Sequence, residues 1–273
     1  MFMKIPPDIL KSRVAVITGA GQGIGAEIVR GFVEKGYRIA LVDYNRDAGL
    51  EQERRWEGKG KFYPCDLSNQ QEVEALCRSL RDDFEAIDVI IHNARSPAKE
   101  RDLLQNLENE WDRAIQVMLK HPIMINHLLL ESLKKSSNPS ILYIGSTNAH
   151  FISQQPLSYH VIKGALSQTV RYLACEYGAH KIRVNLLNPG IVDIPGRPKR
   201  NPQFFQEVVE AVIPLKRTVL ASEIADFCLF FSSEQATYLT GSSLDLDGGE
   251  HLQDHFNLMM NQMRNTTCEM AKI

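Results

Sequence analysis

The sequence predicts an α/β protein: a single doubly wound domain in which about seven parallel strands form a sheet with helices on both faces. Short runs rich in Val, Ile and Leu alternate with longer segments of helical periodicity, the pattern of strands joined by crossover helices. Several of these runs are almost continuously apolar, as expected of strands that are buried on both faces of a parallel sheet.

Seven apolar runs are the candidate strands, and the intervals between them are long enough for crossover helices. In chain order the runs are Arg13–Thr18, Arg38–Val42, Lys61–Cys65, Ile87–His92, Ser140–Gly145, Ile182–Leu187 and Ser243–Leu246. After the fourth run, apolar residues at i, i+3, i+4 and i+7 predict one amphipathic helix, formed around Leu104, Leu107, Trp111, Ala114, Ile115, Met118 and Leu119. Ligands of such sheets bind beyond the carboxyl ends of the strands, so functional residues are expected there.

Composition excludes several classes of protein. Of 273 residues, 44% are hydrophobic and 23% charged, and the formal charge is -2, which offers no general field for nucleic acid or an anionic membrane. No run approaches the ~20 apolar residues of a spanning helix, and the first residues lack the apolar core of a secretory signal. We therefore expect a cytoplasmic protein with neither nucleic acid nor membrane as partner.

Metal and disulfide sites are not expected either. The five scattered cysteines form no Cys-x-x-Cys pair, so reduced thiols are the preferred interpretation. His251 and His255 are four residues apart, but Leu252 stands where a metalloprotease helix has Glu, and no third ligand is evident.

A glycine-rich turn follows the first predicted strand. Residues 18–25 read Thr-Gly-Ala-Gly-Gln-Gly-Ile-Gly, and a helical pattern begins at Ala26. Glycines at such a turn adopt positive φ and let the backbone approach a pyrophosphate at a helix N-terminus. Because the G-x-G-x-x-G/A pattern stands between a strand and a helix, a dinucleotide-binding turn is preferred over an ordinary tight turn.

The second predicted strand is followed by Asp43, 18 residues after Gly25. A carboxylate at this position accepts from both ribose hydroxyls of an adenosine and repels a 2′-phosphate, which favours NAD over NADP. Arg46, three residues further on, could soften this preference.

The turn resembles that of the short-chain dehydrogenase/reductase family, whose pattern is T-G-x-x-x-G-x-G. Further family motifs follow in order and cover roughly residues 10–250. They are Cys65-Asp66-Leu67, His92-Asn93-Ala94-Arg95, Gly145-Ser146, Tyr159 with Lys163 four residues later, Asn188-Pro189-Gly190 and Asp247-Gly248-Gly249. The resemblance implies a Rossmann-like domain over residues 1–250, a substrate loop near residues 193–213 and a C-terminal extension over residues 251–273.

The resemblance also implies the roles of three residues. Tyr159 is the expected acid/base, Lys163 holds the nicotinamide ribose, and Ser146 hydrogen-bonds the substrate oxygen. Lys163 lies one helical turn from Tyr159, and a neighbouring ammonium favours the phenolate. The implied NAD-binding residues are Gly19, Gln22, Gly23, Ile24, Gly25, Asp43, Asp66, Leu67, Asn93, Ala94, Tyr159, Lys163, Pro189, Gly190 and Val192, with Asp66 expected near the adenine.

A second Tyr-x-x-x-Lys match, Tyr177 to Lys181, is assigned to structure. The residue 13 positions earlier distinguishes the two matches. For Tyr159 it is Ser146, at a strand end, whereas for Tyr177 it is Gly164. Helices such as Leu157–Tyr177 pair across subunits in the family, so a dimer or tetramer is expected from the resemblance.

Four departures from the family pattern leave two functions open. Met118 replaces an Asn of the proton relay, Ile194 a Thr, Arg95 a Gly and His92 the first Asn of its motif. The chain is then either an NAD-dependent dehydrogenase of a secondary alcohol or ketone, or a dinucleotide-binding regulatory or scaffold protein with little or no turnover. We favour the enzyme because Ser146, Tyr159 and Lys163 are intact.

The sequence gives less specific information about the substrate. Arg197, Lys199 and Arg200 could meet a carboxylate or phosphate, but a solvated basic turn is preferred. Three polar residues between Ser146 and Tyr159 are expected near the pocket, namely Asn148, His150 and Gln154.

Overall fold

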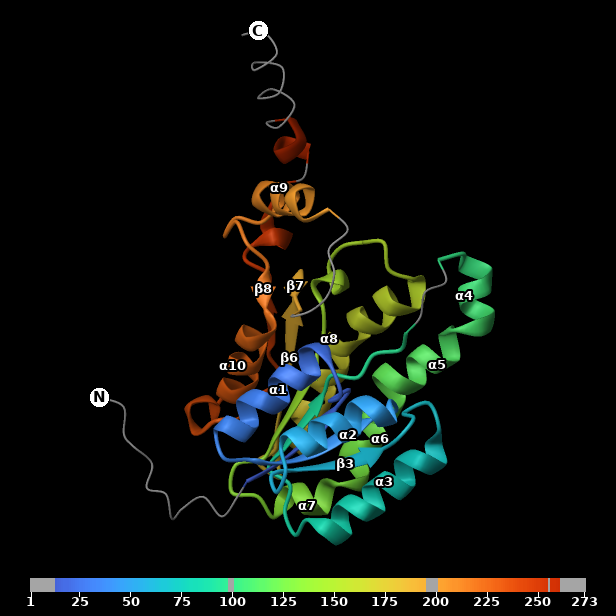
Figure 1. Ribbon diagram of the computed structural model, residues 1–273, viewed down its shortest axis with the longest axis vertical. Coiled ribbons are helices and arrows are strands. Elements are labelled where there is room, and N and C mark those ends of the chain that lie inside the picture. The colour runs from blue at the N-terminus through green and yellow to red at the C-terminus, as the bar shows by residue number, and fades with distance from the viewer. Residues whose placement is uncertain (1–12, 98–100, 195–200, 255, 261–273) are drawn as a thin grey trace, which may run out of the picture.

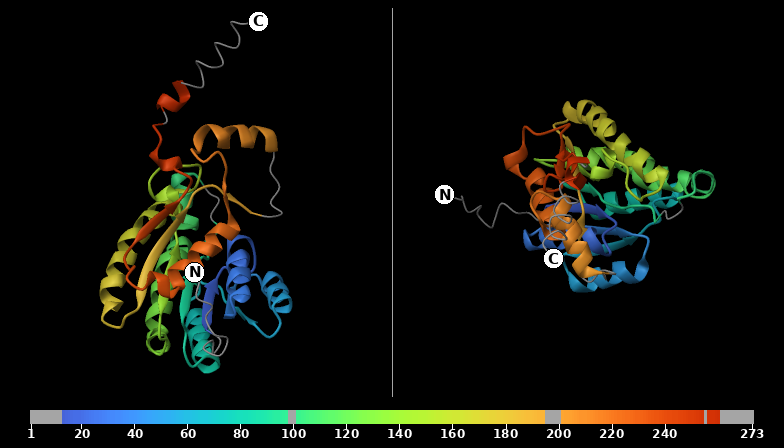
Figure 2. Two further views of the ribbon diagram at one scale, coloured as in Figure 1. Left: turned by 90° about the vertical axis from the view of Figure 1, so that its left-hand side faces the viewer. Right: turned by 90° about the horizontal axis from the view of Figure 1, so that it is seen from above.

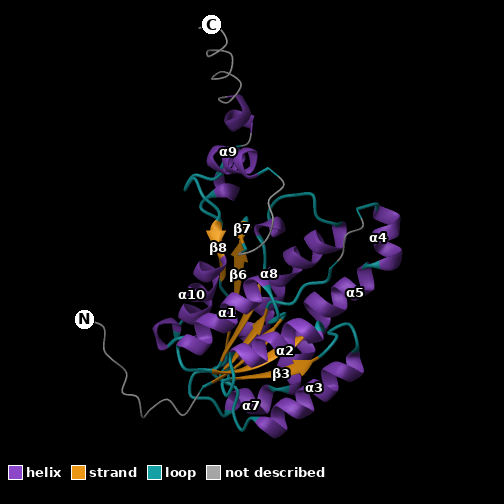
Figure 3. Cartoon of the chain, in the orientation of Figure 1, coloured by secondary structure: helices purple, strands orange, loops and turns teal. Residues whose placement is uncertain are grey.

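A computed structural model describes residues 13–97, 101–194, 201–254 and 256–260, in which a parallel sheet lies between two layers of helices (Figure 1, Figure 3). The sheet has seven strands in the order β3-β2-β1-β4-β5-β6-β9. They are β1 (Val14–Thr18), β2 (Arg38–Asp43), β3 (Gly60–Pro64), β4 (Val89–His92), β5 (Ser140–Ile144), β6 (Arg183–Pro189) and β9 (Ser243–Leu246). The predicted fold class is confirmed, and each candidate strand is found within two residues of its expected bounds.

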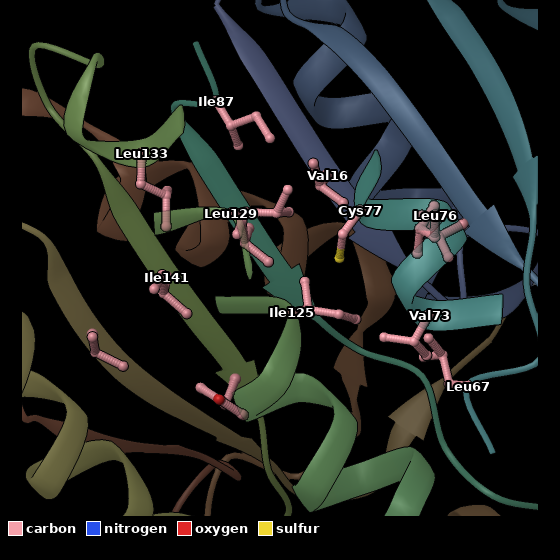
Figure 4. Packing of buried hydrophobic residues seen from close by; sticks show 14 of the residues in the cluster. Val16, Leu67, Val73, Leu76, Cys77, Ile87, Ile125, Leu129, Leu133 and Ile141 are labelled. Atoms are coloured by element: carbon pink, nitrogen blue, oxygen red, sulfur yellow. The ribbon is translucent and has the colours of Figure 1, made fainter. Parts of the chain in front are cut away.

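Helices cover the two faces of the sheet through two separate apolar cores. One face carries α1 (Gly23–Glu34), α2 (Arg46–Arg55) and α10 (Ala221–Ser232), and the other carries α3 (Gln70–Asp83), α6 (His121–Leu128), α7 (Leu130–Lys134) and α8 (Leu157–Gly178). Alternate residues of β1 serve the two cores, since Ala15 and Ile17 face α1 while Val14 and Val16 face the other side. Figure 4 shows Val16 beside Cys77 of α3 and Ile125 of α6 in the second core.

The helix expected around Leu104 to Leu119 is wrong as a single element. The chain forms α4 (Leu103–Asn109), then α5 (Trp111–Ile115), then a π-helical turn over Gln116–Lys120 that runs into α6. Leu104 and Leu107 are 63% and 48% exposed, and the sheet-facing side chains begin only at Ala114. The apolar spacing correctly indicated helix, but spacing alone does not say whether a sheet lies beneath the apolar stripe.

Asn106 links α4 to the start of α8. It is fully buried, and its Oδ1 accepts a hydrogen bond from the backbone N of Ser158, at the start of α8. Its Nδ2 donates to Glu110, beside the break between α4 and α5. α4 therefore fixes the beginning of α8, the helix that carries Tyr159.

Two further short strands lie beyond the carboxyl end of β6. β7 (Val192–Asp193) and β8 (Val219–Leu220) pair in parallel, and α9 (Pro202–Val212) lies in the segment between them (Figure 2). The sequence did not predict β7 and β8 because two residues are too few to show a strand period. In the described ranges, no helix is both long and apolar enough to cross a membrane.

Candidate active site

The turn after β1 is built around glycines that no other residue can replace without displacing the backbone. Gly19 and Gly23 have φ of +66° and +60°, a region that residues with a side chain rarely adopt. A Cβ added at Gly25 would overlap the carbonyl oxygen of Gly19. The first turn of α1 therefore lies directly against the end of β1, and its N-terminus is open for an anion.

Asn93 and Thr18 lock this turn to the end of β4. The Nδ2 of Asn93 donates to the carbonyl oxygens of Thr18 and Gly19, each at 3.1 Å. The Oγ1 of Thr18 accepts from the backbone N of Asn93 and of Ala94, again at 3.1 Å. Asn93 thus sets the shape of the glycine turn through its side chain.

Asp43 lies at the end of β2, facing the same turn. Its two carboxylate oxygens accept from the backbone N of Gly21 and of Asn45, each at 2.9 Å. A carboxylate has acceptor sites for about four hydrogen bonds, so capacity remains for two ribose hydroxyls.

These elements enclose a cleft of about 670 Å³. Its lining includes Gly19, Gln22, Gly23, Ile24, Gly25, Asp43, Asp66, Leu67, Asn93 and Ala94 from the expected cofactor residues. It also includes Arg95 and Ile194, two of the departures from the family pattern. A glycine cradle at a helix N-terminus together with a carboxylate at the next strand end fits a nicotinamide dinucleotide, with the pyrophosphate at α1 and a ribose at Asp43.

Asp66 is held by groups that the sequence did not identify. Its carboxylate pairs with Arg113 of α5 at 3.1 Å and accepts from both N and Oγ of Ser68. Burial opposes ionisation, but the hydrogen bonds from Ser68 and the charge of Arg113 outweigh it and lower the pKa of Asp66. Arg113, Tyr44, Pro97 and Val117 line the cleft although none was expected to do so. Asp66 and Arg113 are 47 residues apart, so no local pattern reveals their contact.

Tyr159 and Lys163 lie together on α8. The Nζ of Lys163 is 5.5 Å from the centroid of the Tyr159 ring and donates to the backbone oxygen of Ile144 at 2.7 Å. Ser146 follows β5 two residues after Ile144, so Lys163 is attached to the strand end that carries Ser146. The backbone N of Ser146 donates to Oδ1 of Asn188 on β6 at 3.2 Å, and its Oγ accepts from Asn148 N.

The remaining expected residues stand at neighbouring strand ends. Pro189 closes β6, Gly190 N donates to Leu246 O at 3.0 Å, and Val192 begins β7. None of these three lines the cleft around α1, nor do Ser146, Tyr159 and Lys163. Arg95 connects the two regions, because it lines the cleft while its guanidinium carbon lies 5.6 Å from the centroid of the Tyr159 ring.

Lys163 is electrostatically unusual. It is 5% exposed, and burial together with the positive charge of Arg95 lowers the pKa of Lys163 to about 7. The amine can therefore both hold and release a proton near neutral pH.

Two departures from the family pattern, Met118 and His92, lie in the packed interior. Met118 is buried in the π-helical turn, where a thioether offers only a weak acceptor. His92 hydrogen-bonds through Nε2 to Asn126, which donates to the Tyr143 hydroxyl. Burial lowers the pKa of His92 to about 4, so its ring is neutral.

Three further groups of residues singled out in the sequence are placed as follows. Tyr177 is buried in the core, and Lys181 lies beyond the end of α8 with φ of +59°. His251 hydrogen-bonds to Asp247, and in the described part of the chain no three His, Cys, Asp or Glu side chains are grouped to hold a metal. His255 and the basic residues Arg197, Lys199 and Arg200 lie outside the described residues.

Comparison with known proteins decides the family. A family model described as enoyl-(acyl carrier protein) reductase matches residues 19–251. This chain belongs to the short-chain dehydrogenase/reductase family. Short-chain dehydrogenase reductase 3a of Arabidopsis thaliana is 31% identical to it, over 88% of this chain and 95% of that protein.

Two solved structures bind different nicotinamide cofactors. The 3-ketoacyl-(acyl-carrier-protein) reductase of Brucella melitensis, complexed with NADH, has a TM-score of 0.77 and 27% identity, and the match covers 88% of this chain and 98% of that one. The L-sorbose reductase of Gluconobacter frateurii, complexed with NADPH and L-sorbose, has a TM-score of 0.79 and 26% identity, over 88% of this chain and 96% of that one. Structures similar to this chain thus include one with each form of the cofactor.

The substitution Gly25→Ala tests the glycine cradle. The added methyl group collides with backbone at Gly19, so we expect NADH to bind at least about tenfold more weakly, as followed by NADH fluorescence. Gly178→Ala is the matched control, because a Cβ at Gly178 meets nothing within 4 Å. Equal NADH affinity in both variants would contradict the assignment.

The substitution Arg95→Gln tests the charge environment of Lys163. Removing a positive charge favours the ammonium form, so we expect the pKa of Lys163 to rise from about 7. NMR titration of protein labelled with ¹³C at lysine Cε measures this, and the signal that disappears in Lys163→Met identifies the residue. Arg113→Gln, which removes a cation paired with Asp66, should leave the pKa of Lys163 unchanged.

Proposed function

We propose that this short-chain dehydrogenase is an NAD(H)-dependent oxidoreductase that transfers a hydride between nicotinamide and a secondary alcohol or ketone. The observation that carries the proposal is the pairing of Tyr159 with a buried Lys163 that is bonded to the strand end bearing Ser146. Relatives of this chain include reductases, and the cleft beside these residues has a lining that suits a dinucleotide.

Tyr159, Ser146 and Lys163 have different roles in the proposed reaction. The nicotinamide, when bound, supplies or accepts the hydride. In the oxidative direction, the alcohol carbon loses a hydride while its hydroxyl gives a proton to the Tyr159 phenolate, which yields the ketone and protonated Tyr159. Ser146 donates a hydrogen bond to the reacting oxygen, where negative charge develops. Lys163 stands beside this phenol, with its Nζ 5.5 Å from the centroid of the Tyr159 ring.

The proton then needs a route from Tyr159 to solvent. Met118 supplies no polar side chain for this purpose. Lys163 lies one helical turn from Tyr159 and has a pKa near 7, so its amine is suited to take part in this transfer. A regulatory protein without turnover, the alternative that Met118 raises, is less well supported because Ser146, Tyr159 and Lys163 are all present.

The preference for NAD rests on Asp43. Its carboxylate lines the cleft and is anchored by Gly21 N and Asn45 N, so it cannot turn away easily from a 2′-phosphate. Arg46 begins α2 on the exposed side of this strand end, and no contact with the cleft lining is evident for it among the described residues.

A homo-oligomer, either a dimer or a tetramer, and a cytoplasmic location also belong to this proposal. The oligomer is supported by apolar side chains exposed on α4 and α8, namely Leu103, Leu104, Leu107, Leu157 and Val161. Sedimentation velocity at micromolar concentration should show a species larger than a monomer.

The substitution Tyr159→Phe tests the acid/base. We expect kcat to fall by at least about 100-fold because the proton acceptor is lost, while NADH affinity changes little. Absorbance at 340 nm with a panel of ketones measures turnover. Tyr177→Phe is the control, since that tyrosine is buried in the core and has no proposed role. Full activity in Tyr159→Phe would remove the mechanism.

The substitution Asp43→Asn tests the cofactor preference. Without the negative charge, the repulsion of a 2′-phosphate disappears, and the ratio of kcat/KM for NADPH over NADH should rise by about tenfold or more. The asparagine keeps one acceptor oxygen for the turn. Asp47→Asn removes a charge from an exposed position nearby and should leave the ratio as it was. An unchanged ratio in Asp43→Asn would show that another group selects the cofactor.

A further inference from the structure

Arg95 is a cation at the reacting end of the cleft that the proposed mechanism does not use. It follows β4 directly after Asn93 and Ala94, its side chain is exposed, and it lines the cleft. Its guanidinium carbon is 5.6 Å from the centroid of the Tyr159 ring, and the Nζ of Lys163 is 5.5 Å from the same centroid. Two cationic groups therefore lie beside one phenol.

The acidic side chains of the cleft are engaged elsewhere. Asp43 accepts from two backbone N–H groups, and Asp66 pairs with Arg113. Among the residues that the structure describes, no carboxylate lies within ion-pair distance of Arg95 or of Lys163. The positive charge of Arg95 reaches Lys163, whose pKa it lowers. Like charges in this arrangement destabilise one another unless an anion joins them.

We propose that Arg95 binds an anionic group of the substrate, so that the enzyme acts preferentially on short oxo acids and the corresponding hydroxy acids. This inference rests on the proposed dehydrogenase function. A guanidinium binds a carboxylate through two parallel hydrogen bonds. Because Arg95 lies beside the ring of Tyr159, a carboxylate one or two carbon atoms from the reacting carbon reaches the guanidinium while the carbonyl oxygen faces the phenol.

The cofactor pyrophosphate is the competing anion. It carries charge and belongs to the same cleft, but its expected partners are the backbone N–H groups at the start of α1. Arg95 instead contacts Tyr159, the group that faces the substrate oxygen. The substrate is therefore the preferred partner, and the two anions are separable by experiment.

The test compares matched pairs of ketones that differ only in charge. Pyruvate and methyl pyruvate form one pair, and acetoacetate and methyl acetoacetate form the other. Reduction is followed as loss of NADH absorbance for the wild type, Arg95→Gln and Arg113→Gln. For at least one pair, we expect the wild type to favour the acid over its ester by about tenfold or more in kcat/KM.

Arg95→Gln should reduce this acid-to-ester ratio by about tenfold or more, mainly through KM. Arg113→Gln removes a cation that lines the same cleft but pairs with Asp66, and it should preserve the ratio. The inference is overturned if the wild type shows no preference for the acid in either pair, or if Arg95→Gln retains the wild-type ratio. It is also overturned if Arg95→Gln weakens NADH binding about tenfold without altering the ratio, because Arg95 would then serve the cofactor.

Failure of the proposed function has a different signature. If neither these four compounds nor a wider panel of neutral ketones is reduced, the dehydrogenase assignment fails. The binding of malonate to the protein, measured by titration calorimetry, then decides the inference alone. Malonate should bind the wild type at least about tenfold more tightly than Arg95→Gln. Equal affinities, or binding to neither protein, would overturn the anion site.

Discussion

The close contact between α1 and the end of β1 is the constraint on which the site depends. There is no room for a side chain at Gly25, since a Cβ there would overlap Gly19 O. The amide of Asn93 then ties the carbonyl oxygens of Thr18 and Gly19 to the end of β4. This contact fixes the direction of α1 and therefore where its free N–H groups point. The same bonds place Ala94 and Arg95 at the rim of the cleft.

A second connection joins the catalytic residues to the sheet. Lys163 donates a hydrogen bond to Ile144 O at the end of β5, Ser146 lies two residues beyond that strand, and Asn188 of β6 accepts a hydrogen bond from Ser146 N. Hydrogen bonds to backbone groups thus join α8, the segment after β5, and β6 at the carboxyl ends of these strands. Lys163 is nearly devoid of solvent contact, so its charge acts on Tyr159 through a medium that screens it weakly.

The sequence predicted those features of the fold and site that depend on residues close together in the chain. The strands were visible because burial on both faces requires continuous apolar runs, and the cradle was visible because glycines at a strand-to-helix turn have few other uses. Tyr159 and Lys163 were visible because they are one helical turn apart. The contact of Asp66 with Arg113 was not visible, since it joins residues 47 positions apart. The break between α4 and α5 was missed because the apolar spacing continues across it.

The sequence showed that residue 95 is an arginine, but it did not show which side chain lies beside Arg95 in the folded protein. Sequence placed Arg95 near the cofactor by family resemblance, whereas its proximity to Tyr159 depends on where the folded chain places α8 relative to the segment after β4. Similarly, the substitution of Met118 for a relay residue was evident from the sequence. The π-helical turn that contains it is a property of the packed chain.

The direction in which the described chain enters and leaves the sheet has a practical consequence. It enters at β1, where Val14 N is bonded to Asp88, at the edge opposite the cleft. It leaves through β9 at the cleft edge, where Asp247 caps the following turn by bonding Gly249 N and His251 N. A fusion partner or surface tether joined at the start of β1 would therefore stand at the end of the strands away from the cleft, whereas one joined after β9 would stand at the end of the strands where the cleft lies.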